Sequence, residues 1–235
     1  MRNRRRRDDG DTMKEIIRLE NVVKMYPWER RAVNDISLSV AGRQRVTVRG
    51  APGSGKSVLM RLIAGMEKPS AGKIFVLDNA VHEMSADAAA AFRNRHIGVM
   101  QRDPGFIEQL SVTENVALPL TVRGVPVRIR NREARGLLKE IGLPGVVNAL
   151  PAQLSVFEKM LAAAARMLIG RPQILLLDDI FAGLTERETV RLTDVINVFL
   201  GQGNYTMIFF CAEKSEKLYT DRTIRISGGK LQEDI

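Results

Sequence analysis

Apolar positions recur along this chain with two spacings, and segments of the two kinds follow one another. Strand-like segments, with alternating or continuous apolar residues, occupy residues 16–23, 36–40, 45–49, 73–77, 97–100, 173–177 and 206–211. Helix-like segments occupy residues 56–64, 85–95 and 186–200, with Ser85 as the expected N-cap of the second. A closing hairpin is expected around residues 227–230. Strands that alternate with helices predict an α/β core.

The region between residues 112 and 170 departs from this alternation. Its pattern is mainly helical, and a turn containing proline and glycine precedes it at residues 103–105. Four prolines are expected to break the helical pattern: Pro119, Pro126, Pro144 and Pro151. The region therefore resembles a helical insertion. The strand that follows, 173–177, is continuously apolar, which is typical of a strand buried in a parallel sheet.

A glycine-rich loop lies between the strand at 45–49 and the helix at 56–64. Gly50 to Ser57 read GAPGSGKS and fit G-x-x-x-x-G-K-S/T, the pattern of a phosphate-binding loop in its expected context between strand and helix. Glycines let backbone N–H groups close around phosphates, and the N-terminus of the helix faces the anion. Lys56 is expected to supply a positive charge and the Ser57 hydroxyl to ligate Mg²⁺.

The apolar strand at 173–177 is followed by two carboxylates, Asp178 and Asp179. An aspartate at the end of a buried strand is where phosphate-loop nucleotidases hold Mg²⁺. In an unrelated fold the same aspartate is often only a turn or capping residue. The phosphate loop upstream favours the metal-binding interpretation for Asp178.

The charge balance indicates a polyanionic partner. Lys and Arg total 36 against 27 Asp and Glu, a formal net charge of +9 with a pI near 10.0, which suits nucleic acid, an anionic membrane surface or a nucleotide. Residues 1–11 hold five Arg and three Asp, a net +2, so the remaining +7 is spread over the body of the chain. We expect residues 1–12 to be a disordered basic tail, the alternative being contact with a membrane or partner.

Composition also excludes several classes of protein. The longest uninterrupted apolar runs are six residues, against roughly 18 for a membrane span. A single cysteine, Cys211, excludes a disulfide framework within the chain, and the basic start lacks the apolar stretch of a secretory signal. These features predict a cytosolic protein with one medium-sized domain at residues 13–235.

Several sequence segments together carry a family resemblance. They are VVKMY, GAPGSGKSVLMRLIAGMEKPSAGKI, RNRHIGVM, LSVTENVALPL, QLSVFEKMLAAAARMLIGRPQILLLDD and ISGGKL, between Ile16 and Leu231. In them the chain resembles the ATP-binding subunits of ABC transporters, most closely the lipoprotein-releasing, macrolide-exporting and cell-division-associated branch. The resemblance implies a P-loop NTPase core, a small antiparallel β subdomain and a helical subdomain at about 104–170. It also implies docking onto transmembrane subunits, and a head-to-tail dimer with a second nucleotide-binding subunit, each ATP lying between one phosphate loop and the other signature motif.

The resemblance assigns roles to individual residues. The expected contacts of ATP are Tyr26, Gly50, Pro52, Gly53, Ser54, Gly55, Lys56, Ser57 and Val58. Tyr26 takes the place of an aromatic that stacks on adenine, the alternative being a half-buried strand aromatic. Asp179 takes the place of the carboxylate, normally Glu, that polarises the attacking water. The expected Mg²⁺ ligands are Ser57, Asp178 and Gln101.

Several family positions are altered. The signature LSGGQ or LSGGE is replaced by Leu154, Ser155, Val156, Phe157 and Glu158, so both glycines are missing. Val156 and Phe157 are expected to obstruct the approach of backbone N–H groups to the partner's γ-phosphate. Ala212 stands where the family has a histidine that contacts the γ-phosphate. The glutamine that links Mg²⁺ to the helical subdomain in the family aligns with Arg102, one place after Gln101. Thr185 replaces an aspartate that contacts the opposite subunit.

These changes spare the phosphate loop and fall on the parts that sense phosphate and activate water. The sequence therefore predicts a subunit, bacterial by resemblance, that lies at the cytoplasmic face of a membrane, binds ATP with Mg²⁺ and hydrolyses it slowly. One alternative is a regulatory or structural subunit with almost no hydrolysis. Another is a nucleic-acid-associated ATPase, suggested by the cluster Arg123, Arg128, Arg130, Arg132 and Arg135. Because soluble relatives of that kind usually carry two such domains in one chain, nucleic acid is not expected.

Overall fold

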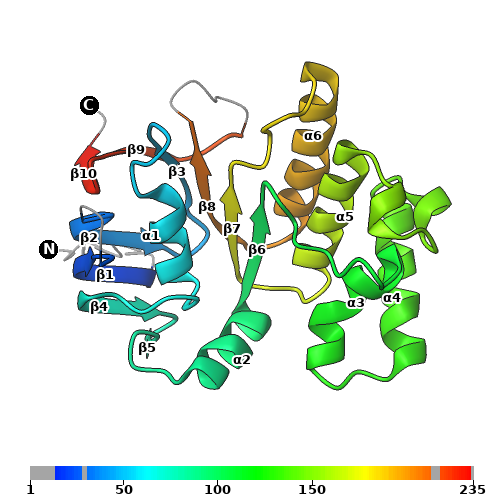
Figure 1. Cartoon of the computed structure of the whole chain (residues 1–235), viewed down its shortest axis with the longest axis horizontal. Helices are drawn as coiled ribbons and strands as arrows, with labels where there is room; N and C mark the ends of the chain where they lie inside the picture. Colours follow the sequence, from blue (N-terminus) through cyan, green and yellow to red (C-terminus); the bar gives the residue numbers. More distant parts are fainter. Residues whose placement is uncertain (1–13, 28–30, 213–217, 234–235) are drawn as a thin grey trace, which may run out of the picture.

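The strands form two sheets in the computed structural model, which describes residues 14–27, 31–212 and 218–233 (Figure 1). The predicted tail at 1–12 lies outside these residues. The larger sheet has six strands in the order β10-β9-β3-β8-β7-β6, all parallel except β10, which runs antiparallel to β9. Its strands are β3 (Arg45–Arg49), β6 (Ile97–Gln101), β7 (Ile174–Asp178), β8 (Thr206–Cys211), β9 (Arg222–Ser227) and β10 (Lys230–Glu233).

The smaller sheet is antiparallel and has the order β2-β1-β4-β5. Its strands are β1 (Glu15–Lys24), β2 (Val33–Ala41), β4 (Ala71–Val76) and β5 (Asn79–Ala80). One face of β2 carries the buried residues Ile36, Leu38 and Val40, and the residues between them are more exposed, as the pleat of a half-buried strand requires. The two sheets meet where β2 contacts β10.

The parallel sheet has a hydrophobic core on each face. In β7, Leu175 and Leu177 belong to one core and Ile174 and Leu176 to the other. Every residue of β7 is buried, which confirms the prediction from its continuous apolar run. The strand therefore ends in the interior of the molecule, and residues at its carboxyl end are held rigidly.

Helices cover both faces (Figure 1). They are α1 (Lys56–Ile63), α2 (Ala86–His96), α3 (Val112–Val122), α4 (Val127–Glu140), α5 (Val156–Leu168) and α6 (Glu186–Gln202), with short 3-10 helices at Pro144–Val146 and Pro151–Gln153. Helix α1 packs between the two sheets, against β4, β7 and β8. Helices α3, α4 and α5 pack together beside the large sheet, with α5 also against β6 and α6. No helix in the described ranges is both long and apolar enough to cross a bilayer.

The starts of several helices follow from side-chain caps. Ser85 accepts a hydrogen bond from Ala88 N at the start of α2, as predicted. Ser111, Ser155 and Thr185 each form a capping box with a glutamate three residues later, which satisfies N–H groups at the starts of α3, α5 and α6.

The expected break at Pro119 is wrong, because α3 continues through this residue to Val122. Proline removes one backbone hydrogen bond and costs about 3 kcal/mol inside a helix. Burial of Val112, Val116 and Ala117 in the core opposes this cost, and Asn94 Nδ2 donates to the Pro119 carbonyl at 3.2 Å. The other three prolines do lie at helix boundaries. The predicted α/β fold with a small antiparallel sheet and a helical part is thus confirmed.

Candidate functional site

The loop from Gly50 to Gly55 requires glycine at its two ends. Gly55 caps α1 with a φ of 106°, and a Cβ there would lie 2.1 Å from the Ala32 carbonyl oxygen. A Cβ at Gly50 would lie 2.4 Å from the Ile226 carbonyl oxygen. No side chain caps α1 and its first turn holds no acidic residue, so no side chain of the helix itself competes for its N-terminal N–H groups. The loop therefore presents the N-terminus of α1 as an anion site.

Lys56 reaches back across this loop. Its Nζ donates to the carbonyl oxygens of Gly50 at 2.7 Å and Ala51 at 2.9 Å. The side chain of Ser54, buried under the loop, is 3.5 Å from the same atom. The ammonium group is thereby held over the loop, where a phosphate oxygen would replace carbonyl oxygens as its partner.

Asp178 ends β7 beside the first turn of α1. Its side chain is buried, and burial raises its pKa above the ordinary value of 3.8, with Asp179 adding to the effect. A hydrogen bond from the Ser57 hydroxyl and the charges of Lys56 and Arg61 oppose this rise. One hydroxyl and one carboxylate oxygen thus lie together next to the phosphate loop, a donor set that fits a hard cation such as Mg²⁺.

Asp179 occupies a turn with an unusual backbone. Its φ is 52°, in the left-handed region that aspartate tolerates better than most non-glycine residues. Its N–H donates to the Phe210 carbonyl at 2.9 Å, which ties it to β8. Ala212 follows β8 and presents only a methyl group, so the position expected to hold a histidine offers no proton donor or acceptor.

These parts line one cleft with a volume of about 780 Å³. Its lining consists of Arg31, Ala32, Pro52, Gly53, Gly55, Lys56, Ser57, Val58, Arg102, Asp178, Asp179, Ala212, Gly228 and Gly229. Most of the predicted ATP contacts lie here, whereas Gly50 and Ser54 lie beneath the loop surface. Three cationic side chains face two carboxylates in this lining, which favours a polyanion.

Sequence reasoning missed the part of the cleft that the β9–β10 hairpin provides. The Gly229 N–H donates to the Ser54 carbonyl at 3.1 Å, and the Gly229 carbonyl accepts from Asn34 N at 2.8 Å. The turn therefore packs directly on the phosphate loop. The segment ISGGK carried a signal for a tight turn, but nothing local indicated what the turn would contact.

Arg102, rather than Gln101, lines the cleft. Gln101 pairs with Asp178 in the sheet, and the next residue donates its N–H to the Asp178 carbonyl at 3.0 Å. The Arg102 side chain is exposed at the carboxyl edge of the sheet. A guanidinium therefore stands where the resemblance implied a metal-linking glutamine.

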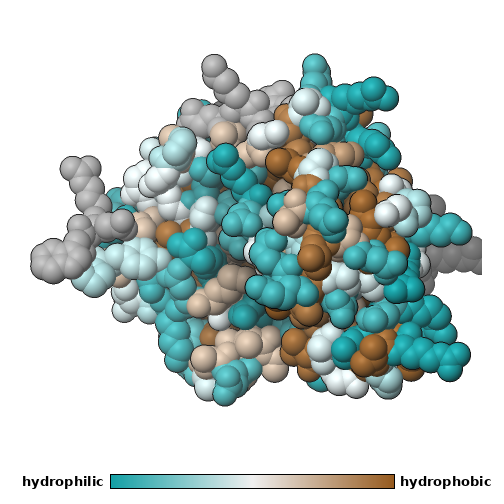
Figure 2. All heavy atoms as spheres, turned by 45° about the vertical axis from the view of Figure 1, so that its right-hand side comes forward, coloured by the Kyte–Doolittle hydropathy of each residue, from teal (hydrophilic) through white to brown (hydrophobic). Residues whose placement is uncertain are grey.

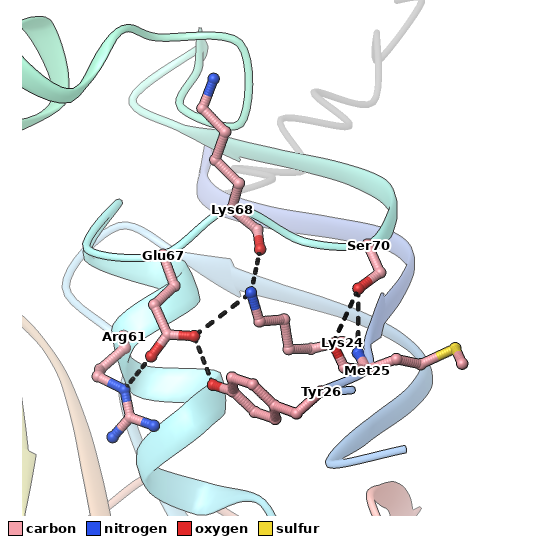
Figure 3. Close-up of polar contacts among 7 residues, drawn as sticks. All are labelled: Lys24, Met25, Tyr26, Arg61, Glu67, Lys68 and Ser70. Carbon is pink, nitrogen blue, oxygen red and sulfur yellow. Dashed lines mark hydrogen bonds and ion pairs between the residues drawn. The ribbon is translucent and has the colours of Figure 1, made fainter. Parts of the chain in front are cut away.

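Tyr26 does not line the cleft but lies beside α1, where its hydroxyl donates to Glu67 Oε2 at 2.5 Å (Figure 3). The same carboxylate accepts from Arg61 Nε at 2.5 Å and pairs with Lys24 Nζ at 3.4 Å. Hydrogen bonds from Tyr26 and Arg61 and the nearby lysine outweigh burial and hold the pKa of Glu67 below its ordinary value. The ring is half-buried and anchored through its hydroxyl.

Four of the five signature residues, Ser155 to Glu158, form the N-cap and first turn of α5, away from the cleft lining. The Ser155 hydroxyl donates to Glu158 Oε2 at 2.8 Å and accepts from Glu158 N at 3.2 Å, so both groups are used within the capping box. Val156 is 58% exposed, while Phe157 is buried with the Arg191 guanidinium over its ring at 5.6 Å. The first turn of α5 thus presents a branched side chain at its surface.

Both histidines lie outside the cleft. His82 Nδ1 lies 3.0 Å from the Ile74 carbonyl oxygen, and its ring meets Phe75 edge-on. His96 stacks against Phe92 with ring centroids 4.8 Å apart, and burial, with Arg95 and Arg123 nearby, lowers its pKa. Their contacts are structural.

Comparison with known proteins identifies relatives over nearly the whole chain. The lipoprotein-releasing system ATP-binding protein LolD of Chromohalobacter salexigens is 29% identical over 222 residues, covering 93% of this chain and 94% of that protein. The ABC transporter ATP-binding protein YbbA of Escherichia coli is 29% identical over 225 residues, covering 96% and 99%. The macrolide export ATP-binding/permease protein MacB 1 of Yersinia pestis is 30% identical over 225 residues, covering 94% of this chain and 34% of that protein.

The similarity to solved structures and the match to a family profile lead to the same assignment. A dimeric structure of the ATP-binding cassette MJ0796 bound to ADP and Pi has a TM-score of 0.86 at 23% identity, covering 93% of this chain and 98% of that one. The ABC transporter family profile matches residues 33–182, which include the phosphate loop, the start of α5 and both aspartates at the end of β7. Since this match spans more than half of the chain, the protein belongs to the ABC transporter family and has the fold of its ATP-binding cassettes.

Proposed function

We propose that this chain is the nucleotide-binding subunit of an ABC-type membrane complex, and that it binds ATP with Mg²⁺ in the cleft described above. The phosphates would lie at the N-terminus of α1, against Lys56 and within reach of Arg31 and Arg102. Charge-assisted hydrogen bonds from guanidinium groups to phosphate oxygens are strong and directional, which suits Arg102 to a phosphate in place of a metal. The charge and shape of the cleft support this assignment.

Ser57 and Asp178 are the residues that would hold Mg²⁺. The ion supplies neutralisation of the phosphate charge when it is bound. The work of this chain's own groups is to fix the triphosphate and to keep water out of the phosphate loop. Tyr26 would stack on the adenine ring at the side of α1.

We infer that hydrolysis is slow and that ATP-dependent closure matters more than turnover. The observation that carries this is the lining of the cleft, where the phosphate-holding residues are complete while Ala212 brings no titratable group to the end of β8. Asp179 is one methylene shorter than a glutamate, and a misplacement near 1 Å can cost about a hundredfold in rate. In a homodimer, Val156 and Phe157 would weaken the opposite side of each site as well.

Turnover measured beside ATP affinity tests this function. We expect the purified chain to bind ATP and to hydrolyse it at less than about one per second, at the bottom of the usual range for enzymes. Lys56→Ala should abolish binding. Turnover of several per second that Asp179→Ala eliminates would contradict slow hydrolysis.

Variants that restore the family's residues identify which substitution limits hydrolysis. Ala212→His with Asp179→Glu should raise turnover little if the signature is the main obstacle, and strongly if it is not. Asp179 has a φ of 52°, where glutamate is less well tolerated, so Ala212→His is also measured alone. Phe157→Gly removes a buried aromatic at a cost of about 3–5 kcal/mol, so its melting temperature must accompany any signature repair.

The chain would work at the cytoplasmic face of a membrane, paired with a second nucleotide-binding subunit and docked on a transmembrane partner. MacB 1, whose name joins ATP-binding and permease, is about three times as long as the part this chain matches, which favours a permease as the partner. A groove of about 480 Å³ between α2, α3 and α5 supports the docking proposal. It is lined in part by Met66, Leu118 and Val122, and Figure 2 shows apolar patches interrupting the hydrophilic surface on the helical side.

The alternative is a regulatory or structural subunit that closes on ATP with almost no hydrolysis. It shares the cleft and the docking groove with the first proposal and differs in turnover alone. An ATPase rate indistinguishable from that of Lys56→Ala, with ATP affinity retained, would favour it.

A further inference from the structure

Glu67 is the centre of a polar cluster that no catalytic or phosphate-binding role accounts for. Its two carboxylate oxygens meet three side chains from two separate segments: Tyr26, Lys24 and Arg61 (Figure 3). The Glu67 and Lys24 side chains are only 24% and 17% exposed, so these contacts are shielded from solvent. Partly buried ion pairs and charge-assisted hydrogen bonds hold geometry better than exposed ones do.

The backbone around Tyr26 is anchored to the same segment as Glu67. Lys24 Nζ donates to the Lys68 carbonyl at 2.9 Å, and Met25 N donates to Ser70 Oγ at 3.0 Å. Ser70 N in turn donates to the Val23 carbonyl at 2.7 Å. The residues just before Tyr26, at the end of β1, are thus bonded to residues 68–70, and Glu67 adds a fixed point at the ring's hydroxyl.

The cluster also sets which face of the ring is available. The Lys24 ammonium lies over the Tyr26 ring, 5.1 Å from its centroid, so one face already has a cation–π partner. A planar ligand would stack on the opposite face. Arg61 belongs to α1, the helix that begins at the phosphate loop, and its charge also acts on Asp178. The helix α1 therefore carries the phosphate loop at its start and, through Arg61 and Glu67, also holds the Tyr26 ring.

We propose that Glu67 is a positioning residue for the nucleotide base, which holds the Tyr26 ring through its hydroxyl so that it is ready to stack on adenine. This inference rests on the proposed ATP-binding function. A side chain that is immobilised only on binding costs affinity, and anchoring it beforehand is worth about two- to tenfold in Kd. The effect belongs to the base alone, because Glu67 is not among the residues lining the phosphate cleft.

The test compares a ligand that has a base with one that lacks it. Binding of ATP and of inorganic tripolyphosphate, each with Mg²⁺, is measured by calorimetry on the full chain. Tyr26→Phe keeps the ring and loses the hydroxyl, whereas Glu67→Ala loses the acceptor. Each is expected to weaken ATP by about two- to tenfold and to leave tripolyphosphate unchanged. The double variant should be no weaker than Glu67→Ala, because both changes break one contact.

Glu83→Ala is the matched control, since that carboxylate has a side chain 74% exposed and should change neither affinity. Equal weakening of both ligands by Glu67→Ala, additive losses in the double variant, or an unchanged ATP affinity in Tyr26→Phe would each overturn the proposal. If Glu67→Ala does not fold, Tyr26→Phe, which removes the hydroxyl and leaves Glu67 in place, carries the comparison by itself. Failure of the unchanged chain to bind either ligand would instead refute the proposed function.

Discussion

Asp178 shows how one residue links stability to binding. Burial raises its pKa, with Asp179 as a further cause, while the Ser57 hydrogen bond opposes the rise. A raised pKa in the folded state means that the stabilising contribution of the protonated carboxyl is fully present below its ordinary pKa of 3.8. That contribution is lost as pH rises through the folded-state value. The ionised form of Asp178, which a bound cation requires, therefore costs the ligand-free chain stability through its burial.

We expect Asp178→Asn to raise the melting temperature of the ligand-free chain at pH 7 and to weaken Mg²⁺-dependent ATP binding by at least about tenfold. The amide keeps an acceptor for Ser57 and removes the buried charge. Thermal unfolding at pH 7 and titration of ATP with and without Mg²⁺ provide the two measurements. A lower melting temperature together with unchanged Mg²⁺ dependence would contradict both the electrostatic account and the metal-binding proposal.

At the scale of elements, α5 is joined to the loop that follows β6. Arg166, half-buried near the end of α5, donates to the carbonyl oxygens of Pro104 and Gly105, and its guanidinium lies 4.7 Å from the Phe106 ring centroid. This loop begins just after Arg102, so one side chain connects the helix that starts at Ser155 to the edge of the cleft. The contact ties the helical part to the sheet.

Arg166→Met should lower the free energy of unfolding by about 2–4 kcal/mol, because it removes hydrogen bonds from a charged group and leaves carbonyl oxygens without a donor. Hydrogen exchange should accelerate at residues 103–106. Arg132→Met is the control, since that side chain is 75% exposed and should change stability by no more than about 0.5 kcal/mol. Equal losses of unfolding free energy in the two variants would contradict the proposal that Arg166 ties α5 to the loop after β6.

Several arginines of the cluster at residues 123–135 make hydrogen bonds within the folded chain. Arg123 donates to Asn94 Oδ1 at 2.8 Å and to the Gly170 carbonyl at 2.8 Å, tying α3 to α2 and to the end of α5. On α4, Arg130 and Arg135 donate to Val125 O and Asn148 Oδ1. Part of the positive charge that suggested a polyanion in the sequence therefore serves internal packing.

At the scale of the whole molecule, the cleft at the phosphate loop and the proposed docking groove lie at separate places on the fold. The cleft is at the carboxyl edge of the large sheet, and the groove lies between α2, α3 and α5. The loop after β6 and α5 contribute to the structure between them. A change confined to the groove should therefore leave nucleotide binding intact.

Val122→Asp should prevent co-purification of a multispanning membrane protein from detergent-solubilised membranes while ATP affinity stays unchanged. Val122 is 70% exposed and lines the groove, so a carboxylate there would oppose an apolar contact. Val190→Asp is the matched control, because Val190 is 56% exposed on α6, outside the groove. Retention of the membrane protein by Val122→Asp, or its loss from both variants, would argue against docking in the groove.

Sequence alone predicted features whose determinants lie close together in the chain. A few neighbouring residues are enough to specify each of three features: the phosphate loop, the continuous apolar strand that ends at Asp178, and the cap at Ser85. The break predicted at Pro119 failed because the proline signal is local, while the burial of Val116 and Ala117 that opposes it depends on packing from elsewhere.

Only the tertiary structure decided which distant residues share the cleft. Ala32, Arg102 and Gly229 line the cleft together with the phosphate loop for two reasons. The two sheets join where β2 contacts β10, and β6 and β9 run parallel to β3, so that the carboxyl ends of these strands lie at the same edge of the sheet. The contact of Tyr26 with Glu67 crosses 41 residues in the same way. Periodicity and motif spacing involve residues that are close together in the sequence, whereas strand order and polar partners are selected by burial of the whole core. The sequence by itself therefore determined the phosphate loop and the fold class. The tertiary structure decided which other residues surround the loop.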